Sequence, residues 1–500
     1  MKPSTKMAKE ATISFVGMGF GDLVRYVFTM LLARLVGPDY LGIYSLANSI
    51  TRVAEVFGKV SLDGGVLRSV SMHLGTQNLE GVRRSIGSTL KMGLVFSTLV
   101  TVTLTLLSGW FAATVFKAGS LLQAVIAVNA LTLPFTVLTQ IAASATQGFK
   151  LLKYKVFVTG ILAPILMLVS TVAFFFMISA EMTIILPSAI SALGCFVVML
   201  VYLKKLTGIS LVKTLYEKFD PEILRYSVPL MLASGVATLM HWLDIAMLGY
   251  FADETTVGLY HPAARTAGVV RAALVALAGI FAPILTEFFA ENKLKEMSDA
   301  YKLVTRWIMT VSLPFAALIT AFPLDFMLLF GAEYAPGAKA LVLLTFATLI
   351  QSFAGVGAPT LNMAGHPKAN LWNYATAVVL NIILNVLWIP RYGITGAACA
   401  SLCSMIVLEL LHSVKVWLLL KLHPFGWKLV KPVIAGIATY TVLFLAKPYL
   451  VLLPTSATLG LALLITILVF GFVLWSLRLD LDDREFAKGL AIIMQSFRRK

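Results

Sequence analysis

The chain has 500 residues, of which 59% are hydrophobic and only 13% are charged, and its mean hydropathy is +0.89. This composition excludes an ordinary soluble globular protein. The net charge of +16 does not indicate a nucleic-acid partner, because Lys and Arg accumulate in the cytoplasmic loops of membrane proteins. The three cysteines, Cys195, Cys399 and Cys403, lie in apolar segments without paired spacing, which speaks against a disulfide framework or a zinc site.

Many apolar segments approach or exceed the roughly 20 residues that a helix needs to cross a bilayer. They lack the alternating pattern of a membrane β-barrel strand. We therefore predict an all-α polytopic membrane protein with about 14 transmembrane helices. The expected spans are 11–36, 40–62, 84–110, 119–146, 155–180, 183–206, 224–251, 256–282, 300–330, 336–362, 369–390, 393–421, 427–447 and 454–477.

The ends of the chain have a basic character that predicts their side of the membrane. The N-terminal MKPSTKMAKE precedes a long first span without a small-residue cleavage site, so we expect a retained first helix. The last residues suit an amphipathic helix on an anionic membrane surface, with Phe486, Leu490, Ile493 and Phe497 on one face. An ordinary solvated tail is the alternative. Most Lys and Arg outside the spans fall on the side that holds both termini, which predicts cytoplasmic termini.

The loops between the spans are short, and no GxxxxGK[ST] motif for nucleotide binding occurs. An ion gradient, the membrane potential, the substrate gradient or a partner protein would therefore supply the energy for any transport.

The sequence contains an internal repeat, which is informative about the whole fold. ARLVGPDYLGIYSLA (33–47) matches GYFADETTVGLYHPA (249–263), so that Gly42 lies 216 positions before Gly258. ATQGFKLLKY (145–154) matches NMAGHPKANL (362–371) at nearly the same offset and pairs Gly148 with Gly365. Two anchors with one offset indicate duplicated six-span units.

Because six is an even number, the two units have the same orientation in the membrane, and a pseudo-two-fold axis along the membrane normal relates them. We expect an N-terminal six-helix lobe at 1–222 and a C-terminal six-helix lobe at 223–422. Two extra helices follow at 423–478, and the amphipathic tail occupies 479–500.

Charged residues inside the first two spans predict a polar chamber. A charge at the centre of a membrane helix costs at least ~2.5 kcal/mol, so it normally faces a polar cavity or a partner. Asp22 and Arg25 share one face of the first span. Asn48, Arg52, Glu55 and Lys59 share one face of the second span.

The second repeat carries a similar set. Asp244 has His241 one turn earlier, and Arg265 and Arg271 follow on the next span. Together, the intramembrane residues have an excess of positive charge, which favours an anionic substrate. A guanidinium group matches phosphate oxygens with a rigid fork of donors. We name Arg25, Arg52, Arg265, Arg271, Asn48 and Lys59 as candidate substrate-binding residues, and Asp22, Glu55, His241 and Asp244 as candidates for coupling or gating.

A structural interpretation competes with this hypothesis. Asp22 could pair with Arg25, and Arg52, Glu55 and Lys59 could neutralise one another, to hold the lobes together. Asp244 could be a proton or Na⁺ site, a gate partner for an Arg of the other lobe, or a structural partner of Arg265 or Arg271.

Three phrases of the sequence resemble one family. They are ARLVGPDYLGIYSLA, LDIAMLGYFADETTVGLYHPAART and NIILNVLWIPRYGITGAACA. The chain resembles the prokaryotic polysaccharide or oligosaccharide flippases of the multidrug/oligosaccharidyl-lipid/polysaccharide exporter superfamily, the Wzx-type O-antigen flippases among them. More distantly, it resembles the flippases of the lipid-linked peptidoglycan precursor.

The resemblance implies two lobes around a central cavity, alternating access, and export of a polyprenyl- or dolichyl-pyrophosphate-linked oligosaccharide across the cytoplasmic membrane of a prokaryote. We expect a monomer without a resident cofactor, in contact with membrane lipids, with Na⁺ or H⁺ as the coupling ion considered. Glycosyltransferases or a polymerase of the same pathway are the protein partners considered.

Two alternatives stay open. One is a cation-coupled multidrug exporter of the same superfamily, although the positive cavity disfavours organic cations. The other is a scaffold that recruits glycosyltransferases or a polymerase, which leaves the intramembrane arginines unexplained. No cluster of His, Cys or carboxylates suggests an enzyme.

Overall fold

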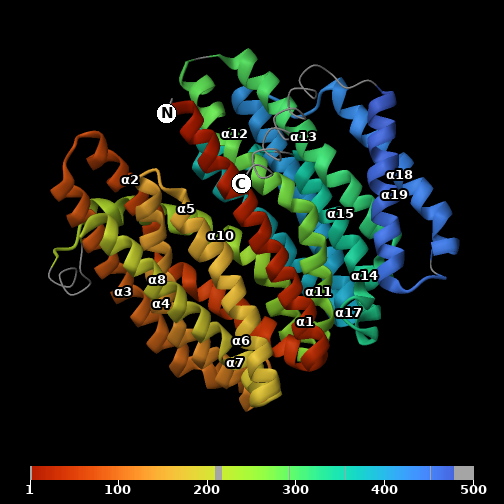
Figure 1. The fold of residues 1–500 in the computed structure, drawn as a ribbon, viewed down its shortest axis with the longest axis horizontal. Helices are drawn as coiled ribbons and strands as arrows, with labels where there is room; N and C mark the ends of the chain where they lie inside the picture. Colours follow the sequence, from red (N-terminus) through yellow and green to blue (C-terminus); the bar gives the residue numbers. More distant parts are fainter. Residues whose placement is uncertain (1–2, 209–216, 292, 355, 451, 478–500) are drawn as a thin grey trace. The chain divides into compact units, whose positions relative to one another are not determined.

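The computed structural model describes residues 3–208, 217–291, 293–354, 356–450 and 452–477, and helices dominate this part of the chain (Figure 1). The predicted amphipathic tail at 479–500 lies outside the described residues. By contacts, the chain divides into two compact units. Unit 1 contains residues 1–265, 330–340 and 367–404, and unit 2 contains 266–329, 341–366 and 405–500. The lobes expected from the repeat are a different division of the chain and stay a prediction.

The helices of the first repeat follow the predicted spans. They are α1 (Pro3–Lys59), α2 (Leu62–Gly75), α3 (Leu79–Trp110) with the π-turn η1 (Phe111–Val115), α4 (Ser120–Gly148), α5 (Leu152–Lys155) with the π-turn η2 (Val156–Leu162), α6 (Ala163–Met177), α7 (Ala180–Ile185) and α8 (Pro187–Thr207). The expected span 183–206 is divided between α7 and α8, where Pro187 begins the second helix.

The remaining helices comprise the second repeat and two further helices. They are α10 (Pro221–Phe251), α11 (Glu254–Ala267), the 3₁₀ turn η3 (Gly268–Arg271), α12 (Ala272–Ala290), α13 (Leu294–Ala321), α14 (Pro323–Leu328), the 3₁₀ turn η4 (Ala332–Gly337), α15 (Ala338–Ala354), α16 (Gly357–Met363), α17 (Pro367–Leu420), the 3₁₀ turn η5 (Trp427–Leu429), α18 (Val430–Leu450) and α19 (Thr455–Ser476). The two extra C-terminal helices are therefore α18 and α19, which pack against each other.

Ten helices of the described residues are long and apolar enough to cross a membrane. Two long helices are kinked, α1 at Gly37, which lies between two predicted spans, and α17 at Gly393, which is the first residue of the predicted span 393–421. Dividing α17 at its kink adds one span to these ten helices, and the two halves of α1 and the segment α11–α12 add three more. The fourteen expected spans are then accounted for. This is a multi-pass membrane protein, and the predicted fold class is confirmed.

The kink in α1 follows from its sequence. Gly37 adopts φ 77°, a left-handed conformation that costs glycine no Cβ clash, and Pro38 follows it without a backbone N–H. The second repeat breaks at the equivalent point, because Ala252 and Asp253 separate α10 from α11. The repeat found in the sequence is thus also a repeat of helix breaks.

Small residues bring the helices of unit 1 close together. The core holds apolar side chains of α2, α3, α4, η2 and α8. A Cβ at Gly93 of α3 would overlap Ile141 of α4, so these two helices pack at short range. Buried Ser and Thr hydroxyls of α3, such as that of Thr89, donate to backbone carbonyls. Membrane helices associate through such small residues because lipid tails offer no hydrophobic driving force between them.

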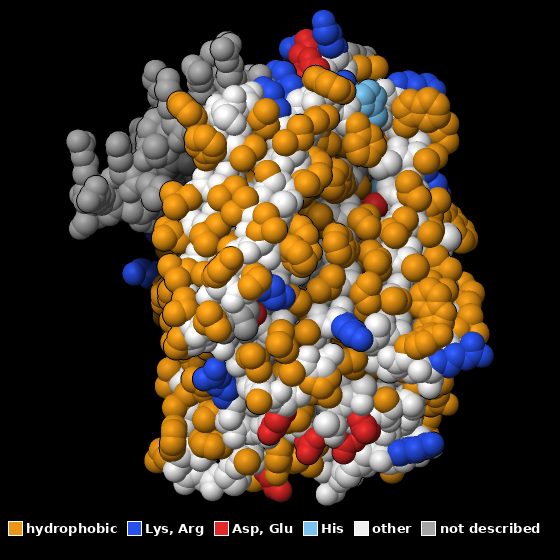
Figure 2. Space-filling model, turned by 90° about the vertical axis from the view of Figure 1, so that its right-hand side faces the viewer, with side chains coloured by type: hydrophobic (Ala, Val, Ile, Leu, Met, Phe, Trp, Pro, Cys, Tyr) orange, Lys and Arg blue, Asp and Glu red, His pale blue; other side chains and the backbone are white. Residues whose placement is uncertain are grey.

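In unit 2, apolar clusters join α12 to α13 and join α13 to α18 and α19. Tyr301 of α13 is fully buried and donates to the carbonyl oxygen of Ala354 at 3.0 Å. Hydrophobic side chains cover most of the face shown in Figure 2, on the side of α18 and α19. Exposed residues such as Phe444 and Phe472 are therefore expected to contact lipid.

Candidate functional site

The second half of α1 carries a connected set of charged side chains. Nη1 of Arg52 donates to Oε2 of Glu55 at 2.8 Å, and Lys59 pairs with Asp63 at 3.1 Å. Gln140 of α4 joins the two pairs, because its amide nitrogen donates to Oε1 of Glu55 at 2.5 Å and its oxygen accepts from Lys59 at 3.1 Å. The structure thus brings three predicted site residues together in unit 1.

Within this set, the exposed fraction differs sharply between the partners. The side chain of Glu55 is 9% exposed, whereas that of Arg52 is 50% exposed. The remaining nitrogens of the Arg52 guanidinium have no hydrogen-bond partner among the described residues. Glu55 therefore holds Arg52 by one nitrogen and leaves the rest of the guanidinium accessible.

The pair on the first half of α1 is also formed. Arg25 donates to Asp22 at 2.9 Å and to the backbone oxygen of Thr159 in η2 at 2.8 Å. A Cβ at Gly21 would overlap the carbonyl oxygen of Gly160, so α1 and η2 approach backbone to backbone. A π-turn is often found at functional positions of helices. Here it supplies a carbonyl that orients Arg25.

Polar residues of both repeats also come together in unit 1. The amide nitrogen of Asn48 donates to the backbone oxygen of Tyr44 at 3.0 Å. The Tyr44 hydroxyl lies in the electrostatic field of both Arg52 and Arg265. His261 interacts electrostatically with Arg265 and His241. Arg271 belongs to unit 2, so the structure does not place it with this group.

Asp244 has a different environment from the other candidates. It is 7% exposed and accepts hydrogen bonds from Tyr260 at 3.0 Å and from Asn385 at 2.8 Å. Asn381 donates to it at 3.2 Å, and the Ser401 hydroxyl contacts it as well. All four of these hydrogen-bond donors are neutral side chains of unit 1. His241 is exposed and packs edge-on against Trp242.

The helices around Asp244 explain how the site is built. Asp244 and Tyr260 come from α10 and α11, and the other three donors come from both sides of the Gly393 kink in α17. The kink returns the chain past Asp244, so that Ser401 and Asn385 reach the same carboxylate. The side-chain amide oxygen of Asn385 is buried and has no hydrogen-bond partner among the residues that the structure describes. A carboxylate, an amide oxygen and a hydroxyl are the ligands that a hard monovalent or divalent cation accepts.

The sequence analysis did not assign a functional role to five residues of these sites, namely Gln140, Tyr260, Asn381, Asn385 and Ser401. Gln140 stands in an apolar helix, and only the contact with Glu55 reveals its part. The two asparagines are four positions apart on one helix face, which is a signal that could have indicated a shared ligand.

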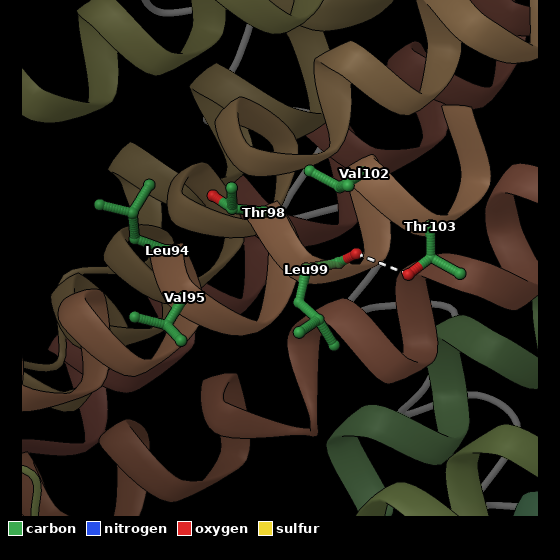
Figure 3. A pocket seen from close by; sticks show the side chains of 6 residues that line it. All are labelled: Leu94, Val95, Thr98, Leu99, Val102 and Thr103. Atoms are coloured by element: carbon green, nitrogen blue, oxygen red, sulfur yellow. Dashed lines mark hydrogen bonds between the residues drawn. The ribbon is translucent and has the colours of Figure 1, made fainter. Parts of the chain in front are cut away.

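A shallow apolar depression lies on α3, away from these polar groups (Figure 3). One face of the helix lines it, with Leu94, Val95, Thr98, Leu99, Val102 and Thr103. Thr103 donates to the backbone oxygen of Leu99 at 2.9 Å, so its hydroxyl is already satisfied. This surface is mostly apolar and suits lipid.

The fold and the buried polar groups define a multi-pass membrane protein built from an internal repeat. The model of the family described as polysaccharide biosynthesis protein matches residues 7–289. The chain belongs to this family, which confirms the resemblance drawn from its sequence. A second family model, MatE, matches residues 229–387.

Curated relatives are archaeal membrane proteins. The probable low-salt glycan biosynthesis flippase Agl15 of Haloferax volcanii is 27% identical over 173 residues, which cover 34% of this chain and 37% of that protein. The probable flippase AglR of the same organism is 27% identical over 175 residues, which cover 33% and 35%. An uncharacterized membrane protein of Methanocaldococcus jannaschii is 24% identical over 254 residues, covering 48% of each chain. The chain thus spans about half, or less, of the length of these relatives.

Solved structures show the same fold. The lipid II flippase MurJ in an inward closed conformation has a TM-score of 0.67 at 15% identity, covering 92% of this chain and 97% of that chain. A multidrug resistance MATE family transporter in an inward-facing conformation has a TM-score of 0.60 at 14% identity, covering 83% and 94%.

Proposed function

We propose that this chain is a flippase that moves a lipid-linked oligosaccharide, carried on polyprenyl or dolichyl pyrophosphate, from the cytoplasmic to the outer leaflet by alternating access. The accessible guanidinium of Arg52 carries this proposal. Glu55 orients it, and the Tyr44 hydroxyl is under the influence of both Arg52 and Arg265. Two cations from different repeats thus share one polar region, which suits a pyrophosphate.

The names of the curated relatives support this substrate class, since both Haloferax proteins are named as flippases and one as a glycan biosynthesis flippase. Those names also support a transport role without catalysis. In the proposed cycle, Arg52, Arg265 and Arg25 offset the desolvation of the pyrophosphate, and the lipid tail stays in the bilayer. Localisation in the cytoplasmic membrane and cytoplasmic termini belong to the same proposal.

The test is flipping of a fluorescent polyprenyl-pyrophosphate oligosaccharide in sealed proteoliposomes. Arg52→Ala should lower the flipping rate by about tenfold or more, because a hydrogen bond to a charged group contributes ~1.5–3 kcal/mol. Arg84→Ala, an exposed arginine of α3, is the matched control and should leave the rate unchanged. If Arg52→Ala flips the substrate at the wild-type rate, Arg52 does not take part in substrate binding.

For the energy source, we propose that Asp244 binds the coupling cation, Na⁺ or H⁺. A buried carboxylate surrounded by neutral donors, with the unpartnered oxygen of Asn385 beside it, supports this role. A counter-charge would stabilise Asp244, because a buried unpaired ion is costly.

An imposed Na⁺ or pH gradient tests the coupling. The wild-type flipping rate should respond to one of the two gradients, whereas Asp244→Asn should flip at a rate independent of both. Asp325→Asn, a buried carboxylate in α14, is the control and should keep the response. A gradient response that survives Asp244→Asn would refute the role of this residue.

The second candidate is a cation-coupled multidrug exporter. The MatE match over 229–387 favours it, because that range contains Asp244, Tyr260, Asn381 and Asn385. Efflux of a cationic dye from the same proteoliposomes, without flipping of any lipid-linked oligosaccharide, would replace the flippase proposal.

A further inference from the structure

Residues that are equivalent in the two repeats contact each other in unit 1. The second half of α1 begins at Pro38, after the kink at Gly37, and α11 begins at Glu254, after the break at Ala252. A Cβ at Gly42 would overlap the carbonyl oxygen of Glu254. A Cβ at Gly258 would overlap the carbonyl oxygen of Pro38. Each glycine therefore lets the backbone of the other repeat come into direct contact.

The two contacts are reciprocal. An offset of 216 positions relates Gly42 to Gly258 and Pro38 to Glu254, so each contact is the repeat equivalent of the other. The same offset separates Asp39 from Thr255, and the Thr255 hydroxyl donates to Oδ1 of Asp39 at 2.5 Å. In a two-fold arrangement, a residue touches its own equivalent only where both lie at the axis. The pseudo-two-fold axis predicted from the sequence thus passes through this contact.

The two backbones approach each other closely at this contact, but few hydrogen bonds join them. Besides the Asp39–Thr255 bond, which is exposed, the two glycines meet backbone carbonyls through their Cα atoms. Such Cα–H···O contacts are weak, and they require that neither residue has a side chain. A contact of this kind closes tightly and can also separate.

We propose that this contact, which we call the glycine junction (residues 38–42 and 254–258), is the gate that closes one end of the transport path. The orientation predicted from Lys and Arg places it at the outer end, between spans 1 and 2 and between spans 7 and 8. The two repeats separate there when the path opens outward, and both glycines are required for closure. This inference rests on the alternating access of the proposed function.

A reversible cross-link tests the gate. Asp39→Cys and Thr255→Cys are introduced into a variant in which Cys195, Cys399 and Cys403 are replaced by serine. Oxidation should form a disulfide across the junction and stop flipping, and a reductant should restore it. Each single-cysteine variant, treated with the same oxidant, is the control and should keep its flipping rate.

Adding a methyl group tests the requirement for glycine. In the double-cysteine background, Gly42→Ala or Gly258→Ala should slow disulfide formation by about tenfold, because a closed state disfavoured by steric overlap is less populated. Gly471→Ala is the matched control, since nothing lies within 4 Å of a Cβ there. Gel filtration separates folded from aggregated variants.

The outcomes of these experiments distinguish a failure of the proposed gate from a failure of the proposed substrate. A cross-linked protein that flips at the uncross-linked rate, or a cysteine pair that forms no disulfide, would overturn the gate. If disulfide formation slows as expected in the alanine variants, the result would support the gate. If the same protein flips no lipid-linked oligosaccharide, the proposed substrate would be refuted while the gate would stand. Disulfide formation as fast in both alanine variants as in Gly471→Ala would refute the requirement for glycine.

Discussion

Asp244 is a buried carboxylate of the second repeat that accepts hydrogen bonds from side chains of two other helices. Four donors reach this one carboxylate, Tyr260 from α11 and the other three from α17. Hydrogen bonds to a charged acceptor contribute ~1.5–3 kcal/mol, about twice the value for a neutral pair. A donor to Asp244 is therefore expected to contribute more to stability than a buried donor whose acceptor is neutral.

At the residue scale, we predict that Tyr260→Phe destabilises the protein more than Tyr301→Phe. Both tyrosines are buried, but Tyr260 donates to a carboxylate and Tyr301 to a backbone carbonyl. The expected losses are ~1.5–3 kcal/mol and ~0.5–1.5 kcal/mol. Unfolding in detergent, followed by circular dichroism against denaturant, measures both. Equal losses would mean that the Asp244 carboxyl group is not a charged acceptor.

Among the helices, the ends of α4 and α16 show the same turn with different residues. After α4, Leu151 N–H bonds to the Thr146 oxygen, and Lys150 adopts φ 59°. After α16, His366 N–H bonds to the Leu361 oxygen, and Gly365 adopts φ 82°. Both are Schellman turns, in which glycine is the favoured left-handed residue. The match of Gly148 with Gly365 read from the sequence thus falls at corresponding turns, displaced by two residues.

At the element scale, we predict that Lys150→Gly stabilises the protein by about 1 kcal/mol, because a non-glycine residue loses roughly 1–2 kcal/mol in the left-handed region. The Lys150 side chain is exposed, so little packing is lost. The midpoint of denaturant unfolding should rise in detergent. Lys153 lies inside α5, so Lys153→Gly should lower the unfolding midpoint, because glycine in a helix interior is unfavourable. A Lys150→Gly variant with a lower midpoint would contradict the strain argument.

The arrangement of the whole chain follows from duplication. The helix breaks at Gly37 and Asp253 are equivalent at an offset of 216, and the same offset relates the two sides of the glycine junction, 38–42 and 254–258. Units related in this way have parallel orientations when each contains an even number of spans. The side of the membrane on which each loop lies is then set by its Lys and Arg content.

At the scale of the molecule, we predict that a cysteine introduced at Ala118 is labelled by an impermeant maleimide in intact cells, whereas one at Lys150 is labelled only after permeabilisation. Both stand in cysteine-free backgrounds. The two positions lie at opposite ends of α4. The reverse labelling pattern would invert the predicted orientation, and with it the outer position of the glycine junction.

The hydrophobic pattern by itself determined the membrane class and the positions of most spans, and the matches of Gly42 with Gly258 and of Gly148 with Gly365 indicated the internal repeat. These features depend on local chemistry, because every backbone polar group in lipid must be satisfied within its own helix. The pairs Asp22–Arg25 and Arg52–Glu55 were also open to prediction, since they are three positions apart on one helix.

Only the tertiary structure decided which groups meet from distant helices. Gln140 bridges Glu55 and Lys59 across more than eighty positions, and Asn385 and Ser401 reach Asp244 across still more. The sequence marks such residues as polar, but it does not say which helix faces another, because small residues and kinks set the helix packing. The repeat placed Gly42 and Gly258 in equivalent positions, and the packing of α1 against α11 showed that each glycine closes on the backbone of the other repeat.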